Sequence, residues 1–218
     1  MATQNKASLP VIKRLPKYYR YLTTMQRNGV EKVSSSELAR IMGTTASQVR
    51  QDFNCFGGFG QQGIGYKVDT LQSEVSKLLF GDNGEKLSTI LLGVGRLGNA
   101  VSSFLTRDVN GYRLLAAFDV REDVVGTEMN GVPVRHIRDL AEFCNANHPQ
   151  VAVLCIPRES AAELSSTLVS LGIKGFWNFS HYDIGVYYPD VAVENVHLGD
   201  SLMTLCYEMQ ALENKKGE

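Results

Sequence analysis

The feature that most constrains this chain is an apolar segment that runs directly into a glycine-rich turn. From Leu87 to Gly98 the sequence reads LSTILLGVGRLG, a strand-like run followed by a Gly-x-Gly-x-x-Gly pattern. Apolar residues then recur at helical spacing, so the turn is expected to open a helix whose free N–H groups face a phosphate. The alternative is a strand-to-helix turn that binds no ligand. The glycine pattern predicts these cofactor-site residues: Gly93, Val94, Gly95, Arg96, Leu97 and Gly98.

A second predicted strand, from Arg113 to Asp119, ends in an acid 21 residues past Gly98. In dinucleotide-binding units a carboxylate at this place accepts hydrogen bonds from the adenosine ribose hydroxyls and repels a 2′-phosphate. The sequence therefore favours NAD⁺/NADH over NADP(H). Arg121, two residues further on, weakens that preference, because a nearby arginine commonly accommodates the 2′-phosphate.

Charge divides the chain into two unlike halves. Residues 1–80 hold 11 lysines and arginines against 5 acids, whereas residues 81–218 hold 11 against 18. A basic front half suits a polyanionic partner. The four cysteines are widely spaced, which favours free thiols over disulfides or a metal site. The sequence has no signal peptide and no apolar run of the roughly 20 residues that span a bilayer, so we expect a cytoplasmic protein without a membrane partner.

The basic half contains the start and stop signals of short helices. A helix is expected from Pro10 to Met25, with Pro16 tolerable only near its start. Capping boxes at Ser34-x-x-Glu37 and Thr45-x-x-Gln48 predict two further helices, separated by a glycine-containing turn. This arrangement is typical of a helix-turn-helix motif, although an ordinary helical hairpin has the same caps.

The second of these helices presents polar side chains suited to DNA. Arg pairs well with guanine, and Gln and Asn pair with adenine, whereas an ordinary solvated face more often holds Glu and Lys. Residues 57–68 contain five glycines and alternating apolar residues, which predicts a hairpin, or wing, directly after the recognition helix. A linker is expected at residues 81–84. The predicted DNA-binding residues are Ser47, Gln48, Arg50, Gln51, Asn54 and Lys67.

Further motifs occur in the acidic half. The apolar run 151–156 is typical of a central parallel strand and ends at Pro157. By analogy with Rossmann topology, Pro157 and the later pair Asn178 and Phe179 are expected beside the nicotinamide half of the dinucleotide, whereas core packing is expected for Trp177. An apolar seam along residues 202–212 suits either a partner helix or packing on the chain's own sheet.

Together these motifs resemble the Rex family of bacterial redox-sensing transcriptional repressors. The resemblance covers nearly the whole chain, because the motifs occur in the family's order and link two unrelated modules. They are QVR through FG at 48–57, GIGYKV at 63–68, GVGRLG at 93–98, FDV at 118–120, PRE at 157–159, GIKG at 172–175 and NF at 178–179.

The resemblance implies a homodimer that binds a palindromic operator on double-stranded DNA as the apo or NAD⁺-bound protein and releases it when NADH binds. It also implies an α/β chain with a winged-helix domain over 1–80, a Rossmann-like doubly wound parallel sheet over 85–198, and a domain-swapped helix over 199–218. Arg50 would contact DNA, and Arg20 occupies a position linked to the switch.

This chain differs from the family pattern at three places. Gln51 replaces a residue that is often basic, and Gln61-Gln62 replace a basic residue of the wing, so fewer phosphate contacts and a weaker salt dependence are expected. The family commonly has an aspartate as the partner of Arg20, and this chain has His197 at that position, with Asp200 one helical turn further on as a substitute.

Two other functions remain open from the residues alone. One is an NAD-dependent dehydrogenase, although the four histidines are scattered and no catalytic set is evident by spacing, which favours a protein that is not an enzyme. The other is a coenzyme A or nucleotide-binding module, because such domains share the glycine turn.

Overall fold

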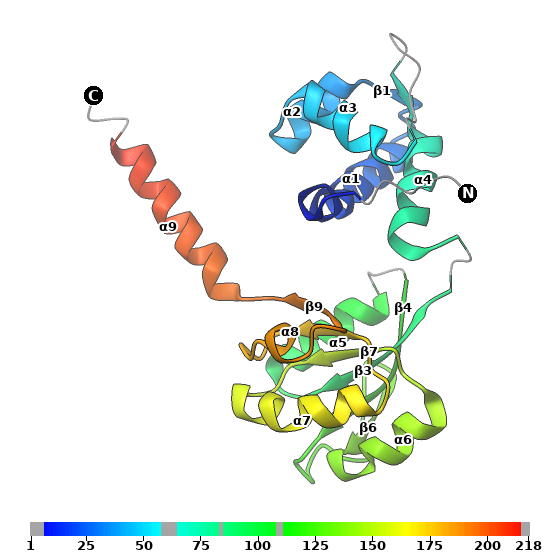
Figure 1. Ribbon diagram of the computed structural model, residues 1–218, viewed down its shortest axis with the longest axis vertical. Coiled ribbons are helices and arrows are strands. Elements are labelled where there is room, and N and C mark those ends of the chain that lie inside the picture. Colours follow the sequence, from blue (N-terminus) through cyan, green and yellow to red (C-terminus); the bar gives the residue numbers. More distant parts are fainter. Residues whose placement is uncertain (1–6, 58–64, 83–84, 108–110, 215–218) are drawn as a thin grey trace. The chain divides into compact units, whose positions relative to one another are not determined.

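The computed structural model describes residues 7–57, 65–82, 85–107 and 111–214. The chain forms two compact units, residues 1–85 and residues 86–218 (Figure 1). The first is mainly helical, and the second contains a seven-stranded sheet. The predicted α/β class is confirmed.

The described residues of the first unit form four helices beside a two-stranded ribbon. Strand β1 pairs antiparallel with β2, in the register Val33 opposite Tyr66. Apolar side chains from all four helices meet in one core, which includes Leu15, Tyr18, Leu22, Leu38, Val49, Phe53, Leu71 and Val75. The elements are α1 (Leu9–Arg27), β1 (Lys32–Val33), α2 (Ser35–Met42), α3 (Ala46–Asn54), β2 (Tyr66–Lys67) and α4 (Val68–Phe80).

Helix α1 corrects the expectation about proline. Pro10 lies in its first turn as expected, but Pro16 lies in its interior, and the helix continues to Arg27. Proline in a helix interior removes one hydrogen bond and costs about 3 kcal/mol. Ile12, whose carbonyl loses its donor, and Pro16 are both exposed, so the affected face is the one that water reaches. The opposite face is buried, which holds the helix together across the proline.

The two caps of the helix-turn-helix motif differ from each other. Ser34 and Glu37 form the predicted reciprocal box at the start of α2, and Gly43 ends that helix in the left-handed conformation with φ of 69°. At α3 the Thr45 hydroxyl accepts from the Gln48 N–H, as predicted. The Gln48 side chain, however, donates to Asp52 instead of reaching back to Thr45.

Most of the predicted wing, residues 58–64, lies outside the described residues. The part that is described corrects one detail, because Val68 begins α4 and does not extend the strand. Gly65, with φ of +78°, lies close to the backbone of strand β1. A Cβ there would lie 2.8 Å from the Val33 carbonyl oxygen, so the close approach requires glycine.

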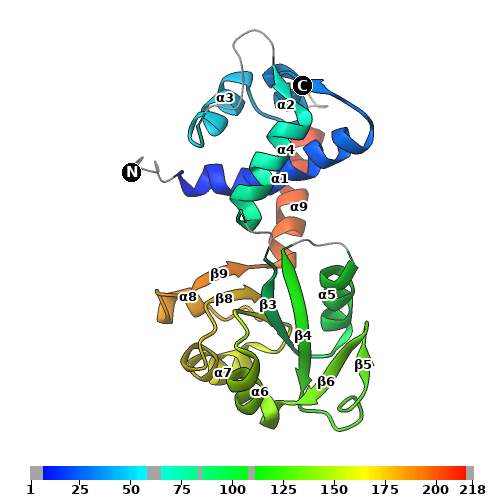
Figure 2. The ribbon, with the colours of Figure 1, turned by 90° about the vertical axis from the view of Figure 1, so that its right-hand side faces the viewer.

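The second unit is a doubly wound sheet with the strand order β5-β6-β4-β3-β7-β8-β9. All neighbours are parallel except β5 and β6. Helix α5 covers one face, and α6 and α7 cover the other (Figure 2). The strands are β3 (Leu87–Leu92), β4 (Tyr112–Asp119), β5 (Glu128–Met129), β6 (Val132–His136), β7 (Val151–Leu154), β8 (Gly175–Asn178) and β9 (Ala192–Asn195). The helices are α5 (Arg96–Arg107), α6 (Leu140–Asn147), α7 (Arg158–Ser170), α8 (Ile184–Tyr187) and α9 (Leu198–Asn214), with a 3₁₀ turn at Ile137–Asp139.

Alternation along the central strands gives each face its own core. Ile90, Leu92 and Phe118 pack toward the α6 and α7 side, whereas Leu91 and Ala117 pack toward α5. The chain reverses its winding direction between β3 and β7, so the crevice at their carboxyl ends is the place where this fold accommodates a ligand.

Helix α9 has no buried residue. Its apolar seam is therefore not packed on the sheet of its own chain, which removes one of the two expectations for this segment. The seam residues Leu202, Leu205, Met209 and Leu212 are all more than half exposed, at 63%, 51%, 55% and 61%.

Candidate functional site

The glycine turn after β3 has the geometry of a phosphate cradle. Gly93 has φ of +97°, and a Cβ there would collide with the Cys155 carbonyl oxygen. A Cβ on Gly98 would collide with the Gly93 carbonyl oxygen, so α5 packs on the turn only with glycine at that position. Gly95, in contrast, has no atom within 4 Å of where a Cβ would stand. At Gly93 and Gly98 the packed backbone leaves no room for a side chain, whereas the space beside Gly95 is open. This arrangement fits a bound pyrophosphate.

Helix α5 begins within the glycine pattern, at Arg96. The first N–H groups of a helix lack partners within the helix and carry a partial positive charge, which favours a phosphate group. Gly95, Arg96 and Leu97 are exposed and Val94 is half-buried, so these predicted residues line the open side of the turn.

Asp119, at the carboxyl end of β4, is held by four hydrogen bonds. The Val94 N–H donates to Oδ2 at 2.7 Å, and Arg121 donates from its backbone N–H, Nε and Nη2 at 3.0, 3.1 and 3.2 Å. Burial alone would raise the pKa of Asp119, but the hydrogen bonds from Arg121 and Val94 outweigh it and hold that pKa below its usual value. The carboxylate is therefore ionised at neutral pH, and it lies against the glycine turn.

The structure gives Asn178 a different setting from the one expected. Its side chain is buried, and Nδ2 donates to the Tyr182 carbonyl at 2.7 Å and to Asn195 Oδ1 at 2.8 Å. Its Oδ1 accepts from the Ser180 N–H and hydroxyl. Because an amide side chain has two donors and two acceptor sites, these bonds use its full capacity. Asn178 braces the loop after β8, and its predicted contact with a cofactor remains a prediction.

The other residues at this edge are more accessible. Pro157 is exposed at the start of α7, and Phe179 is half-buried, with its ring 4.9 Å from that of Trp177. Trp177 also contacts Phe104 at 6.2 Å and belongs to the α5-side core, as expected for core packing.

Two histidines meet beyond β8 and β9, a feature that the sequence did not reveal. The rings of His181 and His197 lie 4.7 Å apart, and His181 has a positive φ of 61°. Nδ1 of His197 is 3.7 Å from Asp200 Oδ2, and its buried Nε2 has no hydrogen-bond partner among the described residues. Arg20 is exposed on α1, with its guanidinium 5.6 Å from the Tyr21 ring centre. Because Arg20 belongs to the first unit and His197 to the second, their pairing remains a prediction.

In the first unit, α3 presents the predicted polar face. Ser47, Arg50, Gln51 and Asn54 are all exposed, while Val49 and Phe53 on the opposite side are buried. Arg50 Nη1 donates to the Ser35 hydroxyl at 3.0 Å, which holds the side chain beside the start of α2. Lys67 is exposed at the end of β2. Gln48 differs from the other predicted residues, because its amide points inward to Asp52.

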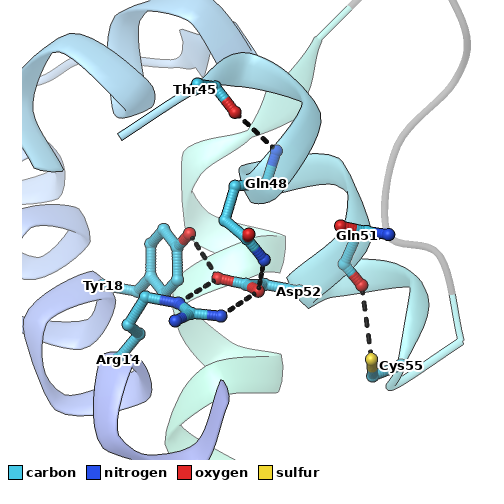
Figure 3. A network of polar contacts seen from close by, with 7 residues as sticks. All are labelled: Arg14, Tyr18, Thr45, Gln48, Gln51, Asp52 and Cys55. Carbon is cyan, nitrogen blue, oxygen red and sulfur yellow. Dashed lines mark hydrogen bonds and ion pairs between the residues drawn. The ribbon is translucent and has the colours of Figure 1, made fainter. Parts of the chain in front are cut away.

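Beneath this face lies an ionic network that joins α3 to α1 (Figure 3). Asp52 is fully buried and accepts from Nε and Nη2 of Arg14, both at 2.7 Å, and from Tyr18 Oη and Gln48 Nε2, both at 2.9 Å. Burial would raise the Asp52 pKa, but the hydrogen bonds from Arg14, Gln48 and Tyr18 lower it below its usual value. One signal could have revealed the network: Asp52 lies on the apolar side of α3, where a charge requires a partner.

An apolar groove of about 530 Å³ opens on the α5 face, at the amino ends of the strands. It lies at the opposite edge of the sheet from the glycine turn. Its lining includes Leu87, Phe104, Tyr112, Val151, Trp177, Val193 and Glu194.

Across residues 7–57, 65–82, 85–107 and 111–214, no cluster of three or more histidine, cysteine or acidic side chains could hold a metal ion. No described helix combines the length and apolar character needed to cross a bilayer.

Comparison with known families divides the chain at the same place as the fold. Residues 6–54 match a family model described as "Putative DNA-binding protein N-terminus", and residues 84–182 match one described as "CoA binding domain". The redox-sensing transcriptional repressor Rex of Caldicellulosiruptor saccharolyticus is 44% identical over 209 residues, which cover 96% of this chain and 94% of that protein. Rex of Thermoanaerobacter pseudethanolicus is 42% identical over 221 residues, which cover 100% and 97%.

Solved structures agree with this grouping. RSP, a Rex-family repressor, in complex with NADH has a TM-score of 0.87 and 38% identity, covering 97% of this chain and 98% of that one. RSP in complex with NAD⁺ and operator DNA has a TM-score of 0.84 and 40% identity at the same coverage. The relatives named here are repressors, not enzymes. On sequence identity over nearly its entire length, this chain belongs to the Rex family of redox-sensing transcriptional repressors.

Proposed function

We propose that this chain is a cytoplasmic repressor that binds a palindromic operator as a homodimer, in its apo or NAD⁺-bound form, and releases it when NADH binds. The observation that carries the proposal is the presence, in one chain, of an exposed polar face on α3 and an open glycine turn before α5. Its relative RSP has been crystallised both with NADH and with NAD⁺ and operator DNA.

DNA reading is assigned to the exposed face of α3. Arg50, Gln51 and Asn54 supply base contacts in the major groove, and Ser47 and Lys67 supply phosphate contacts. Gln48 acts through its bond to Asp52, which fixes how α3 leaves the core. The chain offers few cations here, so its affinity for DNA is expected to depend only modestly on salt.

Dinucleotide binding is assigned to the carboxyl edge of the sheet. The turn at residues 93–98 and the first N–H groups of α5 hold the pyrophosphate, and Asp119 with its partner Arg121 faces the adenosine ribose. Pro157 and Phe179 border the nicotinamide half, where the oxidised and reduced rings differ by one positive charge and in planarity.

Release of DNA requires that NADH favour a conformation in which the two recognition helices no longer match their half-sites. A ligand shifts such an equilibrium only by its difference in affinity for the two states. Typical couplings of about 1–3 kcal/mol change affinity by about 5- to 150-fold. The spacing of the two α3 helices is the quantity on which binding depends, because half-sites lie whole helical turns apart.

The homodimer is supported by two apolar surfaces of the second unit. The α9 seam is exposed along its whole length, and the groove beside Trp177 is lined almost wholly by apolar side chains. We propose that α9 of each subunit crosses to the other and covers this groove. Size-exclusion chromatography with light scattering tests this: Leu205→Glu should shift the dimer toward monomer.

The test of the function is a mobility shift with the operator duplex that RSP binds, at fixed salt, with either NADH or NAD⁺ added. Loss of the complex at micromolar NADH, but not at equal NAD⁺, supports the proposal. Equal binding with both saturating dinucleotides would contradict it.

The match to a CoA binding domain favours a second candidate ligand for the same turn. Competition of coenzyme A against NADH, followed by NADH fluorescence, separates the two. Displacement of NADH by coenzyme A at comparable concentration would favour the nucleotide-binding alternative. Continuous consumption of NADH with ketone or aldehyde substrates would instead indicate a dehydrogenase.

A further inference from the structure

The Asp119 carboxylate, which we assign to the adenosine ribose, already has hydrogen-bond partners in this chain. An acid at this position selects NAD(H) because it accepts from the ribose hydroxyls and repels a 2′-phosphate. Here both oxygens of Asp119 already accept two hydrogen bonds each, three of the four from Arg121. A carboxylate has about four lone-pair sites, so the hydrogen-bonding capacity of Asp119 is filled before any ligand arrives.

Arg121 is held over the turn as well as over the acid. Its Nη2 also donates to the Val94 carbonyl at 3.0 Å, which fixes the guanidinium between β4 and the glycine turn. The side chain is nevertheless 48% exposed, whereas that of Asp119 is 8% exposed. Nη1 of Arg121 has no partner among the described residues, so the outer edge of the guanidinium can still donate toward solvent.

The local charge follows from the same geometry. The positive charge of Arg121 cancels the negative charge of Asp119. Because the guanidinium is the more exposed group, a ligand at the turn meets it before the carboxylate. Of the next two acids, Glu122 lies 3.6 Å from His136 Nε2, while Asp123 is exposed and close enough to raise the pKa of Arg121. Arg96 is exposed at the start of α5.

We propose that Arg121 sets the coenzyme range of this site, so that it takes 2′-phosphorylated dinucleotides such as NADPH as well as NADH. In this arrangement Nη1 donates to the 2′-phosphate, and the salt bridge removes the repulsion that Asp119 would otherwise exert. This inference rests on the proposed dinucleotide site, but it concerns only the adenosine end and does not depend on DNA binding.

The experiment measures the dissociation constants of NADH and NADPH by the fluorescence of their shared reduced ring. Because the two ligands differ only at the 2′-position, the ratio of their constants isolates the effect of the phosphate. We expect the ratio in the native protein to be within about tenfold of one. Arg121→Ala should shift it about tenfold further toward NADH, and Arg121→Lys, which keeps the charge without the fork, should lie between.

Arg96→Ala is the matched control, since Arg96 is also exposed and is assigned to the pyrophosphate that both ligands share. It should weaken NADH and NADPH by similar factors and leave their ratio unchanged. Circular dichroism checks that each variant is folded.

The outcomes separate this inference from the proposed function. NADH binding without measurable NADPH binding would overturn the role of Arg121 alone, and so would an unchanged ratio in Arg121→Ala. Failure of both ligands to bind would overturn the dinucleotide site together with this inference.

Discussion

Each unit of this protein contains an arginine fork on a carboxylate, and the two forks differ in what surrounds them. In the first unit the Arg14–Asp52 pair joins residues 38 apart in sequence, and Asp52 is fully enclosed (Figure 3). In the second, the Arg121–Asp119 pair joins residues two apart, and the guanidinium is half exposed beside an open turn. The first fork connects two helices. The second lies between β4 and the glycine turn, which backbone hydrogen bonds already join.

This difference separates a structural role from a ligand-binding one. A fully enclosed carboxylate that is bound by side chains of another helix holds elements in place, and removal of one partner leaves a buried charge without compensation. A fork at an open edge contributes little to folding, but its groups can exchange partners when a ligand binds. We therefore expect changes at Asp52 to alter stability first, and changes at Asp119 or Arg121 to alter affinity first.

The largest effect is expected from Asp52→Asn. The substitution keeps the side-chain shape but turns an amide donor or a neutral oxygen toward Arg14, so the guanidinium loses its counter-charge. We expect the first unit to lose about 2–3 kcal/mol of unfolding free energy, at or below the lower end of the range for broken buried pairs, because Arg14 is 30% exposed. Urea unfolding followed by circular dichroism measures this. Asp69→Asn, at an exposed acid of α4, is the control.

The same variant should also weaken binding to the operator. Asp52 orients α3 without touching the duplex, so affinity should fall while the dependence of affinity on salt stays the same. A change of less than about 1 kcal/mol in stability would show that the two networks do not differ as we infer.

A second large effect concerns acid. Because the folded-state pKa of Asp52 lies below its ordinary value of 3.8, its contribution is present above that value and is lost as the pH falls through the depressed folded-state pKa. The stability gap between the native protein and Asp52→Asn should thus be full at pH 7 and shrink below about pH 4. Urea unfolding at stepped pH values measures the gap. A gap that stays constant down to pH 2 would contradict the assignment.

A smaller effect is expected from Asp119→Asn. The hydrogen bond from the Val94 N–H can persist to the amide oxygen, so the melting temperature should change little. NADH affinity should fall about five- to tenfold, because a ribose hydroxyl that displaces one of the Arg121 hydrogen bonds then meets a neutral acceptor instead of a charged one. NADH fluorescence titration and thermal unfolding on the same sample separate the two effects. A large drop in melting temperature with unchanged affinity would reverse the roles of the two forks.

Local signals were readable in the sequence, and contacts between distant elements were not. The Ser34–Glu37 box and the glycine turn depend on residues within one or two turns of chain, so spacing alone predicts them. The Arg14–Asp52 fork depends on how α1 packs on α3, which no spacing encodes. Capping was also predicted too simply at Thr45, since Gln48 had the choice of a partner on the buried side of its own helix.

The candidate site follows the same division. Asp119 was predicted from its distance to the glycine turn, but three of the four bonds that fill its oxygens depend on the bend that carries Arg121 back over the turn. Asn178 was placed correctly at the end of β8, but its partners Tyr182 and Asn195 come from a loop and a neighbouring strand. Position along a strand was thus predictable, while the side-chain partners at its end were not.

The smallest effects are expected when lysine replaces each arginine, and they compare the forks most directly. Lysine keeps the charge but cannot make two parallel hydrogen bonds to a carboxylate. Arg14→Lys should therefore cost about 1 kcal/mol of unfolding free energy, since one bond to the enclosed Asp52 is lost and no water can replace it. Arg121→Lys should leave the unfolding curve unchanged, because solvent reaches the half-exposed end of that fork. Paired urea titrations measure both. If the two curves shifted equally, burial would not be what distinguishes the forks, and the structural role of Asp52 would have to come from Tyr18 and Gln48 instead.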